Sequence, residues 1–357
     1  RYFPFRETIM LMSKPSITEL EKQFVAEAMA LSDIGVGPFI GQFEELWAQK
    51  NKMAYGVSCN SGTNAIYLAL KALGIGPGDE VIVPEYTMIA TAWAVSYTGA
   101  KPVFVDCGDD LLMNPSLISE KVTDRTKAII VVPIYGRTYE EKHWSQGDIY
   151  NGARKNGLFV VEDMAEAHGI MPQGDIACYS FYGNKILTTG EGGMCLTDNK
   201  EWADEMRKLS NMYMDENRTM LHPKQGHNFR MTNLQAAVGL AQVMRLDEIL
   251  EKRKQIEKWY NENLPEHVKM PLREVLWMMD IKTDHQEEMK DYLEENGIPS
   301  RYGFKPMSMQ PQYLGEYKHL NAYKWSKRII YLPTYTDMTE DDVKTVCQTL
   351  KSFESGK

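Results

Sequence analysis

The sequence predicts an α/β fold with a mostly parallel central sheet and a smaller α+β domain toward the C-terminus. Three observations lead to this prediction. Between residues 54 and 200, short apolar segments alternate with amphipathic helical segments, a pattern typical of parallel sheets covered by helices on both faces. The runs at 128–132 and 158–161 are almost continuously apolar, as expected for strands buried on both faces. Beyond residue 260, two strand-like and two helical segments follow.

The first half of the chain supplies the elements of the large sheet. A strand is predicted at 54–58, and the helix after it carries apolar residues at the helical spacing i, i+3, i+4 and i+7, from Ile66 to Leu73. Gly74 and the turn at 76–79 end this helix. Further strands are predicted at 81–83, 102–105, 128–132, 158–161, 176–181 and 193–197, with a helix from about 87 to 97.

A long helix is predicted to begin at Thr232, because Gln235 three residues later forms a capping-box arrangement. We expect this helix to continue through the charged stretch 245–260 and to lead into the second domain. The predicted boundary divides the chain into a large domain, 1–245, and a small domain, 246–357. The small domain is expected to contain strands at 275–281 and 329–332, a helix at 285–296, and a closing helix that begins at Thr339.

Composition excludes several classes of protein. Of the 357 residues, 43% are hydrophobic and 25% are charged, which is ordinary for a soluble globular protein. The formal net charge of −9 and the lack of a basic stripe argue against a nucleic-acid-binding protein. No apolar run is long enough for a transmembrane helix, and no signal peptide is evident, so we expect neither membrane insertion nor secretion.

The cysteine and histidine patterns indicate neither a disulfide framework nor a metal site. The five cysteines are odd in number, scattered and never paired as CxxC, which favours a reducing, cytoplasmic location. His222 and His227 are too sparse to suggest a metal centre. Gly35, Gly37 and Gly41 do not form the GxGxxG pattern of a dinucleotide-binding loop.

Lys185 and Asp163 are the most informative pair of residues in the chain. Lys185 lies in the tract 180–193, which is rich in small residues, and Asp163 ends a predicted buried strand. An unpaired buried carboxylate is costly, so Asp163 is expected to face a cation. Pyridoxal 5'-phosphate (PLP) requires such a pair: the lysine forms a Schiff base with the cofactor aldehyde, and the aspartate keeps the pyridine nitrogen protonated.

A third element strengthens this prediction. Ser61, Gly62 and Thr63 fall where a strand turns into a helix, so free backbone N–H groups, the positive end of a helix dipole and a hydroxyl group coincide. Alone, such a sequence is more often a simple helix cap. Together with Asp163 and Lys185, it indicates a phosphate site for PLP.

These segments resemble the DegT/DnrJ/EryC1/StrS family of PLP-dependent nucleotide-sugar aminotransferases, which have the aspartate aminotransferase fold, or fold type I. The resemblance runs almost from end to end. It is carried by the segments 37–44, 61–65, 78–84, 162–169, 180–193, 228–231 and 297–301.

The resemblance implies a role for each catalytic candidate. Lys185 would be the Schiff-base lysine and would move the proton during the reaction. Asp163 would pair with the pyridine nitrogen. Glu166 stands where the family has Gln or Glu near the phenolic oxygen of the cofactor.

The resemblance also implies a phosphate site and a dimer. Gly62, Thr63 and Ser180 would hold the cofactor phosphate. Asn228 would reach the same phosphate from the neighbouring subunit, so the protein would be a homodimer with shared active sites.

Two segments depart from the family pattern. The family usually stacks an aromatic side chain on the pyridine ring, whereas the matching position here is Met88, and Tyr86 is the candidate to compensate for it. The segment 138–147 is atypical and could change the entrance of the site.

By this resemblance, the chain would transfer the amino group of glutamate to the C4 ketone of a nucleotide-linked 4-keto-6-deoxyhexose. The tract 182–193 is most similar to members that act on GDP-4-keto-6-deoxymannose. A dTDP- or UDP-linked sugar and amination at C3 are the alternatives. The family's 3-dehydratases replace the lysine with His, and a non-catalytic PLP-binding scaffold would have lost Asp163, Lys185 or the phosphate loop. Arg301 and Lys305 lie in a turn that could contact a diphosphate or only solvent.

Overall fold

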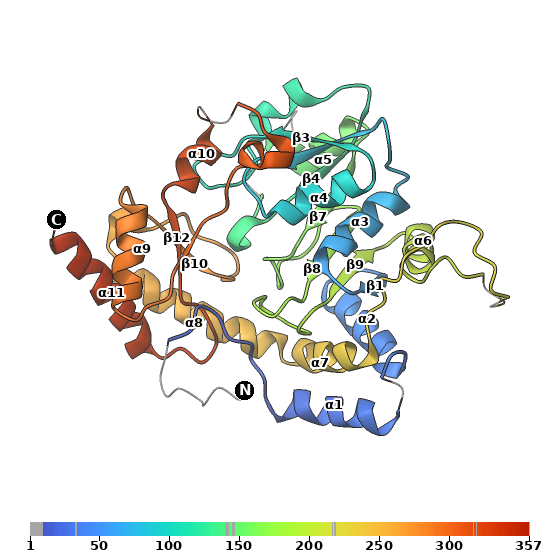
Figure 1. Ribbon diagram of the computed structural model, residues 1–357, viewed down its shortest axis with the longest axis horizontal. Helices are drawn as coiled ribbons and strands as arrows, with labels where there is room; N and C mark the ends of the chain where they lie inside the picture. Colours follow the sequence, from blue (N-terminus) through green and yellow to red (C-terminus); the bar gives the residue numbers. More distant parts are fainter. Residues whose placement is uncertain are drawn as a thin grey trace.

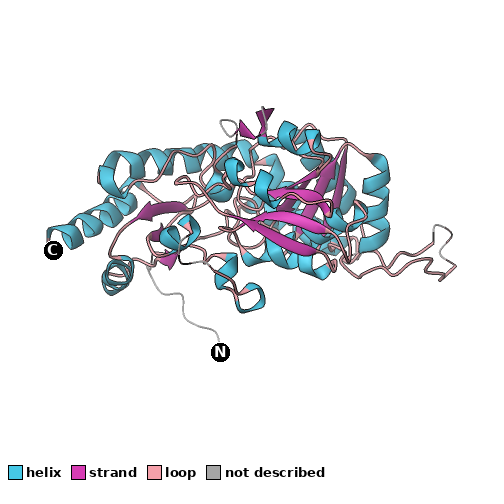
Figure 2. Ribbon diagram, turned by 90° about the horizontal axis from the view of Figure 1, so that it is seen from above, coloured by secondary structure: helices cyan, strands magenta, loops and turns pink. Residues whose placement is uncertain are grey.

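The computed structural model describes residues 10–32, 34–139, 143–144, 147–215, 217, 219–316, 318 and 320–356. A large sheet with helices on both faces occupies one side of the molecule, and a small sheet with helices lies at the other (Figures 1 and 2). In the part of the chain that the structure describes, no helix has the length and apolar character needed to cross a membrane.

The large sheet has seven strands in the order β1-β9-β8-β7-β4-β2-β3. All neighbouring pairs from β8 to β3 are parallel, whereas β9 runs antiparallel to both β8 and β1. The predicted mostly parallel sheet is therefore confirmed. The strands are β1 (Tyr55–Cys59), β2 (Glu80–Pro84), β3 (Lys101–Val105), β4 (Thr126–Val131), β7 (Phe159–Asp163), β8 (Ile176–Ser180) and β9 (Gly193–Thr197).

Helices cover this sheet because its strands are apolar on both faces. The helix α3 (Gly62–Ala72) packs on β8 and β9 with residues 65–70 buried, α5 (Ile149–Lys155) packs on β7, and α6 (Lys200–Ser210) packs on β1. The helix predicted from about 87 to 97 is α4 (Ile89–Tyr97). A short hairpin, β5 (His143–Trp144) and β6 (Gly147–Asp148), overlaps the atypical segment 138–147, of which residues 140–142 and 145–146 lie outside the described residues.

Two N-terminal helices were not predicted. They are α1 (Glu19–Ala30) and α2 (Pro38–Lys50), and both pack against α7 (Asn233–Met244). Figure 1 shows α1 beside α7 along one edge of the molecule. Their apolar pattern is weak, so the contact with α7 rather than a strong local signal explains their position.

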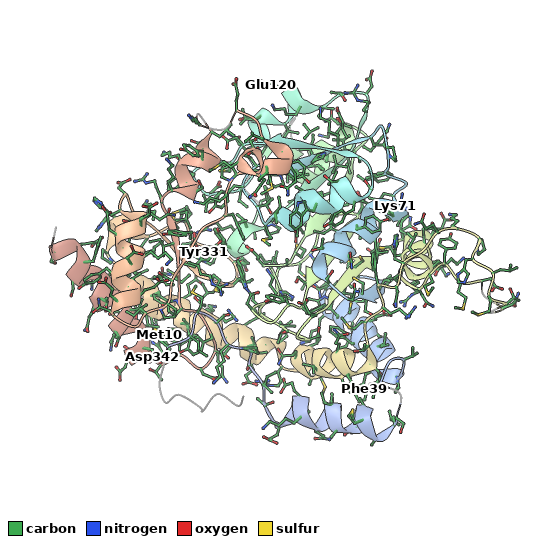
Figure 3. The ribbon with its side chains drawn as sticks, viewed as in Figure 1. Met10, Phe39, Lys71, Glu120, Tyr331 and Asp342 are labelled. Carbon is green, nitrogen blue, oxygen red and sulfur yellow. The ribbon has the colours of Figure 1, made fainter. Side chains whose placement is uncertain are left out.

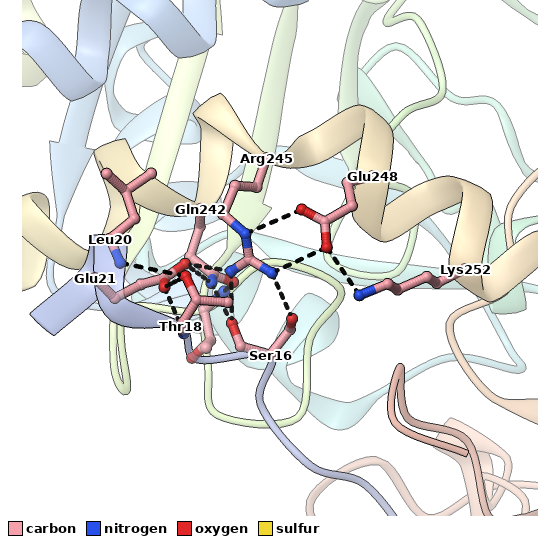
Figure 4. A network of polar contacts seen from close by, with 9 residues as sticks. Ser16, Thr18, Leu20, Glu21, Gln242, Arg245, Glu248 and Lys252 are labelled. Atoms are coloured by element: carbon pink, nitrogen blue, oxygen red, sulfur yellow. Dashed lines mark hydrogen bonds and ion pairs between the residues drawn. The ribbon is translucent and has the colours of Figure 1, made fainter. Parts of the chain in front are cut away.

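The long helix predicted from Thr232 is divided. Its capping box at Thr232 and Gln235 is confirmed, but α7 ends before Arg245, whose backbone leaves helical geometry, and α8 (Leu246–Asn263) follows. Figure 4 shows why Arg245 is fixed there: its guanidinium contacts the buried carboxylate of Glu21 at 2.6 Å and the Ser16 carbonyl oxygen at 3.2 Å. The N-terminal segment is thus attached at the junction between α7 and α8.

The second part of the chain forms a three-stranded sheet, in the order β10-β12-β11, with helices packed on it. Its elements are β10 (Met279–Lys282), α9 (Gln286–Glu295), β11 (Arg301–Tyr302), α10 (Asn321–Ser326), β12 (Ile329–Leu332) and α11 (Glu340–Ser355). The predicted N-cap Thr339 is confirmed, because its side chain accepts a hydrogen bond from the Asp342 N–H.

Two details of the small sheet differ from the prediction. The strand predicted at 275–281 begins only at Met279, because the N–H groups of Glu274 and Val275 donate to the Gly136 carbonyl oxygen of the large part instead of to a strand. The turn at residue 301 contains the short edge strand β11.

Buried apolar side chains form two clusters. The larger cluster fills the space around the seven-stranded sheet, and the smaller cluster draws its buried residues from 256–353. Trp277 and Tyr331 come from the second part of the sequence but belong to the larger cluster. Tyr331 lies between the two parts (Figure 3), where the candidate site is found.

Candidate active site

A cavity of about 490 Å³ lies where the carboxyl ends of β7 and β8 meet the N-termini of α3 and α4. Ligands of open α/β sheets bind at this edge. The second part of the chain closes the cavity from the other side with Trp277, Phe304 and Tyr331. Of the predicted site residues, the lining includes Gly62, Thr63, Met88, Asp163, Glu166, Ser180 and Lys185. A larger cavity of about 950 Å³ along β3 contains none of these residues.

Asp163 is the last residue of β7 and is buried. Its carboxylate accepts hydrogen bonds from the Thr91 hydroxyl at 2.7 Å and from the Ala165 N–H at 3.2 Å. Burial raises the pKa of Asp163, while these two hydrogen bonds and the charge of Lys185 act in the opposite direction. No ion pair to Asp163 is found among the described side chains, so the site holds a buried acid without a bound cation.

Lys185 faces the same cavity from the tract after β8. Burial lowers the pKa of Lys185, and the charges of Glu166 and Asp163 raise it. The net effect is a lowered pKa of Lys185, which suits a group that has to release and take up a proton, because its two protonation states come closer in free energy near neutral pH.

Glu166 is buried and held by one backbone group. Its Oε2 accepts a hydrogen bond from the Tyr135 N–H at 2.8 Å. Tyr135 has a positive φ of 54°, a conformation that few non-glycine residues adopt, and this directs its N–H toward Glu166. Burial raises the pKa of Glu166 to about 7, although Lys185 and the Tyr135 N–H lower it. The carboxyl group can therefore change its protonation state near neutral pH.

The N-terminus of α3 also lines the cavity. Ser61 is the N-cap, and its hydroxyl accepts the Asn64 N–H at 3.2 Å. A side chain at Gly62 would place its Cβ 2.6 Å from the Ser180 Cβ, so only glycine allows this approach. The N–H groups at the start of the helix and the hydroxyls of Thr63 and Ser180 thus border one polar end of the cavity, suited to an anion.

The cavity fits PLP. A buried acid that forms no ion pair with a described side chain, a lysine with a lowered pKa and a helix N-terminus suited to phosphate all border one space of about 490 Å³. Within the described residues, no group of three or more His, Cys, Asp or Glu side chains could hold a metal ion.

Met88 and Tyr86 have different positions. Met88 lines the cavity at the N-cap of α4 with a relative exposure of 48%. Tyr86 is fully buried, hydrogen-bonds to the Tyr135 hydroxyl at 3.0 Å and is not part of the lining. The suggestion that Tyr86 replaces the missing aromatic residue is therefore wrong.

Asn228 lies outside the cavity of its own chain. It is exposed, forms an isolated bridge with Asn211 and is not among the lining residues. Within one chain, the structure does not bring Asn228 together with the other predicted residues.

Several lining residues were not identified from the sequence. Trp277, Asn184 and Tyr331 border the cavity, and Thr91 supports Asp163 from α4. Thr91 lies four residues after Thr87 on the predicted helix, so the two hydroxyl groups share one helix face. This spacing is the sequence pattern from which Thr91 could have been identified. Trp277 and Tyr331 carried no local signal, because they reach the cavity only through the packing of the second part of the chain.

Comparison with known proteins agrees with this geometry. The sequence model of the DegT/DnrJ/EryC1/StrS aminotransferase family matches residues 15–351. The fold and the site define a PLP-dependent sugar aminotransferase. The chain belongs to the DegT/DnrJ/EryC1/StrS aminotransferase family.

Two relatives and one solved structure illustrate the range of the family. A GDP-perosamine synthase of Caulobacter vibrioides is 39% identical, over 95% of this chain and 96% of the relative. A UDP-N-acetyl-3-dehydro-α-D-glucosamine 3-aminotransferase of Acidithiobacillus ferrooxidans is 34% identical over 84% of each chain. The PLP form of Spr1654 from Streptococcus pneumoniae, assigned as a sugar aminotransferase, has a TM-score of 0.90 and 25% identity, covering 98% of this chain and 99% of the other.

Proposed function

We propose that this protein transfers the amino group of glutamate to the C4 ketone of a nucleotide-linked 4-keto-6-deoxyhexose, with GDP-4-keto-6-deoxymannose as the first candidate. The single observation that supports this substrate most strongly is the 39% identity, over almost the full length, to a GDP-perosamine synthase. The presence of Lys185 in the cavity supports amination rather than dehydration, because the family's dehydratases have His there.

When bound, PLP supplies an electron-accepting ring that stabilises negative charge on the carbon from which a proton is removed. In our proposal Asp163 holds the pyridine nitrogen in its protonated form. Thr91 and the Ala165 N–H orient the carboxylate, since they occupy one oxygen each. A bound pyridinium would also give the buried Asp163 a partner for an ion pair.

Lys185 would attach the cofactor before the reaction and carry the proton during it. Its amine takes a proton from the donor in the first half-reaction and returns a proton to the aminated sugar carbon in the second. Glu166 would contact the phenolic oxygen, and Gly62, Thr63 and Ser180 would hold the phosphate. Buried Trp277 and Tyr331 would exclude water from the side of the cavity that the second part of the chain forms, which would strengthen the electrostatic effects of Asp163 and Lys185.

Arg301 is the candidate for contact with the nucleotide diphosphate. It lines the cavity from β11, its side chain is exposed, and no ion pair to it is found in the described part of the chain. Lys305 belongs to the same turn but does not line the cavity, and its Nζ lies 5.5 Å from the centre of the Tyr302 ring.

Replacing Arg301 with Gln is expected to raise the KM for the sugar nucleotide at least about 10-fold with a smaller change in kcat, because one charge-assisted contact to phosphate is lost. Steady-state kinetics with varied sugar nucleotide measure this change. Lys305→Gln is the matched control and should leave KM unchanged. Equal effects of both substitutions would contradict a specific role for Arg301.

We also propose a homodimer in which Asn228 serves the phosphate site of the neighbouring subunit. The exposure of Asn228 outside its own cavity supports this arrangement. The division into domains 1–245 and 246–357 and a cytoplasmic location belong to the same proposal. The five cysteines, all unpaired and buried, are compatible with a reducing compartment.

Mixed dimers test the shared site. Combining Lys185→Ala protomers with Asn228→Ala protomers should restore activity, since one site of each mixed dimer keeps Lys185 from one protomer and Asn228 from the other. Combining Lys185→Ala with Asp163→Asn is the control and should restore none, because both changes lie on the same side of the shared site. A fully active monomer in sedimentation would disprove the arrangement.

The reaction itself is tested by incubating the PLP-loaded protein with glutamate and GDP-, dTDP- or UDP-linked 4-keto-6-deoxy sugars. NMR of the product should show an amine at C4 of the GDP-linked sugar, together with 2-oxoglutarate. An amine at C3, or a C3 without oxygen and without nitrogen, would overturn the C4 proposal.

A further inference from the structure

The side chain of Lys185 ends over the indole ring of Trp277. The Lys185 Nζ lies 4.2 Å from the centre of the ring, and Trp277 is 4% exposed. A cation at this distance is attracted to the negative face of an aromatic ring. The indole N–H donates to the Asn184 carbonyl oxygen at 2.9 Å, so the ring is oriented by the residue next to the lysine.

The backbone of Trp277 is fixed by a buried cation. Arg253 is 3% exposed, and its Nη1 donates to the carbonyl oxygens of Leu276 at 3.2 Å and Trp277 at 2.9 Å. Burial lowers the pKa of Arg253 to about 10, and no carboxylate among the described residues forms an ion pair with it. Burying a guanidinium that forms no ion pair is unfavourable in free energy. The hydrogen bonds of Arg253 to these two carbonyl groups therefore define its structural role.

The rest of the segment 273–278 is also held firmly. The N–H groups of Glu274 and Val275 donate to the Gly136 carbonyl oxygen at 2.9 and 3.3 Å. Arg273 contacts the buried carboxylate of Asp280 at 2.5 Å. The segment that carries Trp277 is therefore attached to both parts of the chain, and the position of its ring relative to Lys185 is defined.

We infer that Trp277 is a positioning residue whose ring holds the Lys185 ammonium group whenever the amine is not bonded to the cofactor. The inference rests on the proposed role of Lys185. Two carboxylates, Asp163 and Glu166, also act on Lys185 from the end of β7. An aromatic face differs from a carboxylate because it attracts the ammonium group but cannot accept its proton. Trp277 thus keeps the protonated lysine inside the cavity without removing the proton that Lys185 has to deliver.

The test measures the protonation of Lys185 in the cofactor-free protein. Limiting amounts of acetic anhydride are added at a series of pH values, and mass spectrometry quantifies acetylation of the Lys185 peptide. Exposed Lys351 serves as the internal reference. Since the ring stabilises the charged form, Trp277→Leu should lower the midpoint for Lys185 by about 0.5–1 pH unit. Trp277→Phe keeps an aromatic face and should shift the midpoint less than half as far.

An unchanged midpoint in Trp277→Leu would overturn the inference. An equal shift in the Phe and Leu variants would also overturn it, because the effect would then come from the indole N–H. Trp325→Phe, at a buried tryptophan outside the cavity, is the control and should leave the midpoint unchanged. If thermal melting shows that the Leu variant is unfolded, Trp277→Met replaces it with the same expected shift. No substrate is used, so failure of the proposed reaction would not alter this result.

Discussion

Lys185→Ala is expected to abolish turnover, with a loss of at least about 1,000-fold. In the proposed mechanism, the substitution removes both the point of attachment of the cofactor and the group that moves the proton, and proton transfer by a positioned side chain is worth about 100- to 10,000-fold by itself. Among the described lining residues, the other cation is Arg301, whose guanidinium is not an amine that could take the place of Lys185.

Two measurements separate attachment from binding. Borohydride reduction of the PLP-loaded wild type, followed by peptide mass spectrometry, should leave the cofactor on the Lys185 peptide, and the Ala variant should bind PLP without this covalent product. Lys71→Ala, at the far end of α3 from the cavity (Figure 3), should behave as wild type. Normal turnover by Lys185→Ala would remove the basis of the proposed function.

Asp163→Asn is expected to reduce kcat/KM about 100- to 1,000-fold, or roughly 3–4 kcal/mol of transition-state stabilisation. The amide preserves the size of the side chain but removes the charge that, in the proposed mechanism, keeps the pyridine nitrogen protonated, so the ring would accept electrons less well. The effect should be large because the carboxylate is buried, where solvent screens it little.

Thr91→Val gives a graded comparison for Asp163. It removes the 2.7 Å hydrogen bond to the carboxylate but leaves the charge, so we expect a loss of only several-fold. Steady-state kinetics of both variants, with saturating PLP, measure these losses of activity. Wild-type rates in Asp163→Asn would place the partner of the pyridine nitrogen elsewhere.

The central sheet and half of the cavity could be predicted from the sequence because their signals are local. Continuous apolar runs marked β4 and β7. Asp163 ends β7, and Lys185 and the start of α3 each come after a strand whose carboxyl end lies at the same edge of the sheet. Strand order and the antiparallel direction of β9 were not predicted, because they depend on pairing between segments far apart in the chain.

The other half of the cavity depends on how the second part of the chain packs. Trp277 lies in a segment whose apolar residues resemble a strand, but Gly136 and Arg253 provide the hydrogen-bond partners of its backbone. Arg245 interrupts a helix that was predicted to be continuous, and its side chain is fixed by Glu21, more than 200 residues earlier. Neither contact could be predicted from a periodic sequence pattern, because each joins residues that are distant in sequence.

The position of β9 between β1 and β8 has a consequence for the order of folding. β1 has β9 as its sheet neighbour, so Tyr55 pairs with Thr197 and cannot join the sheet until that residue has been synthesised. During synthesis α3 therefore has a large apolar surface before β9 is available to cover it. Pairing over so long a loop is slow, because the entropy of closing the loop is lost before the contacts form. The end of the cavity at the N-terminus of α3 should accordingly be among the last regions to become ordered, a result that pulse-labelling hydrogen exchange during refolding would detect as late protection of β1.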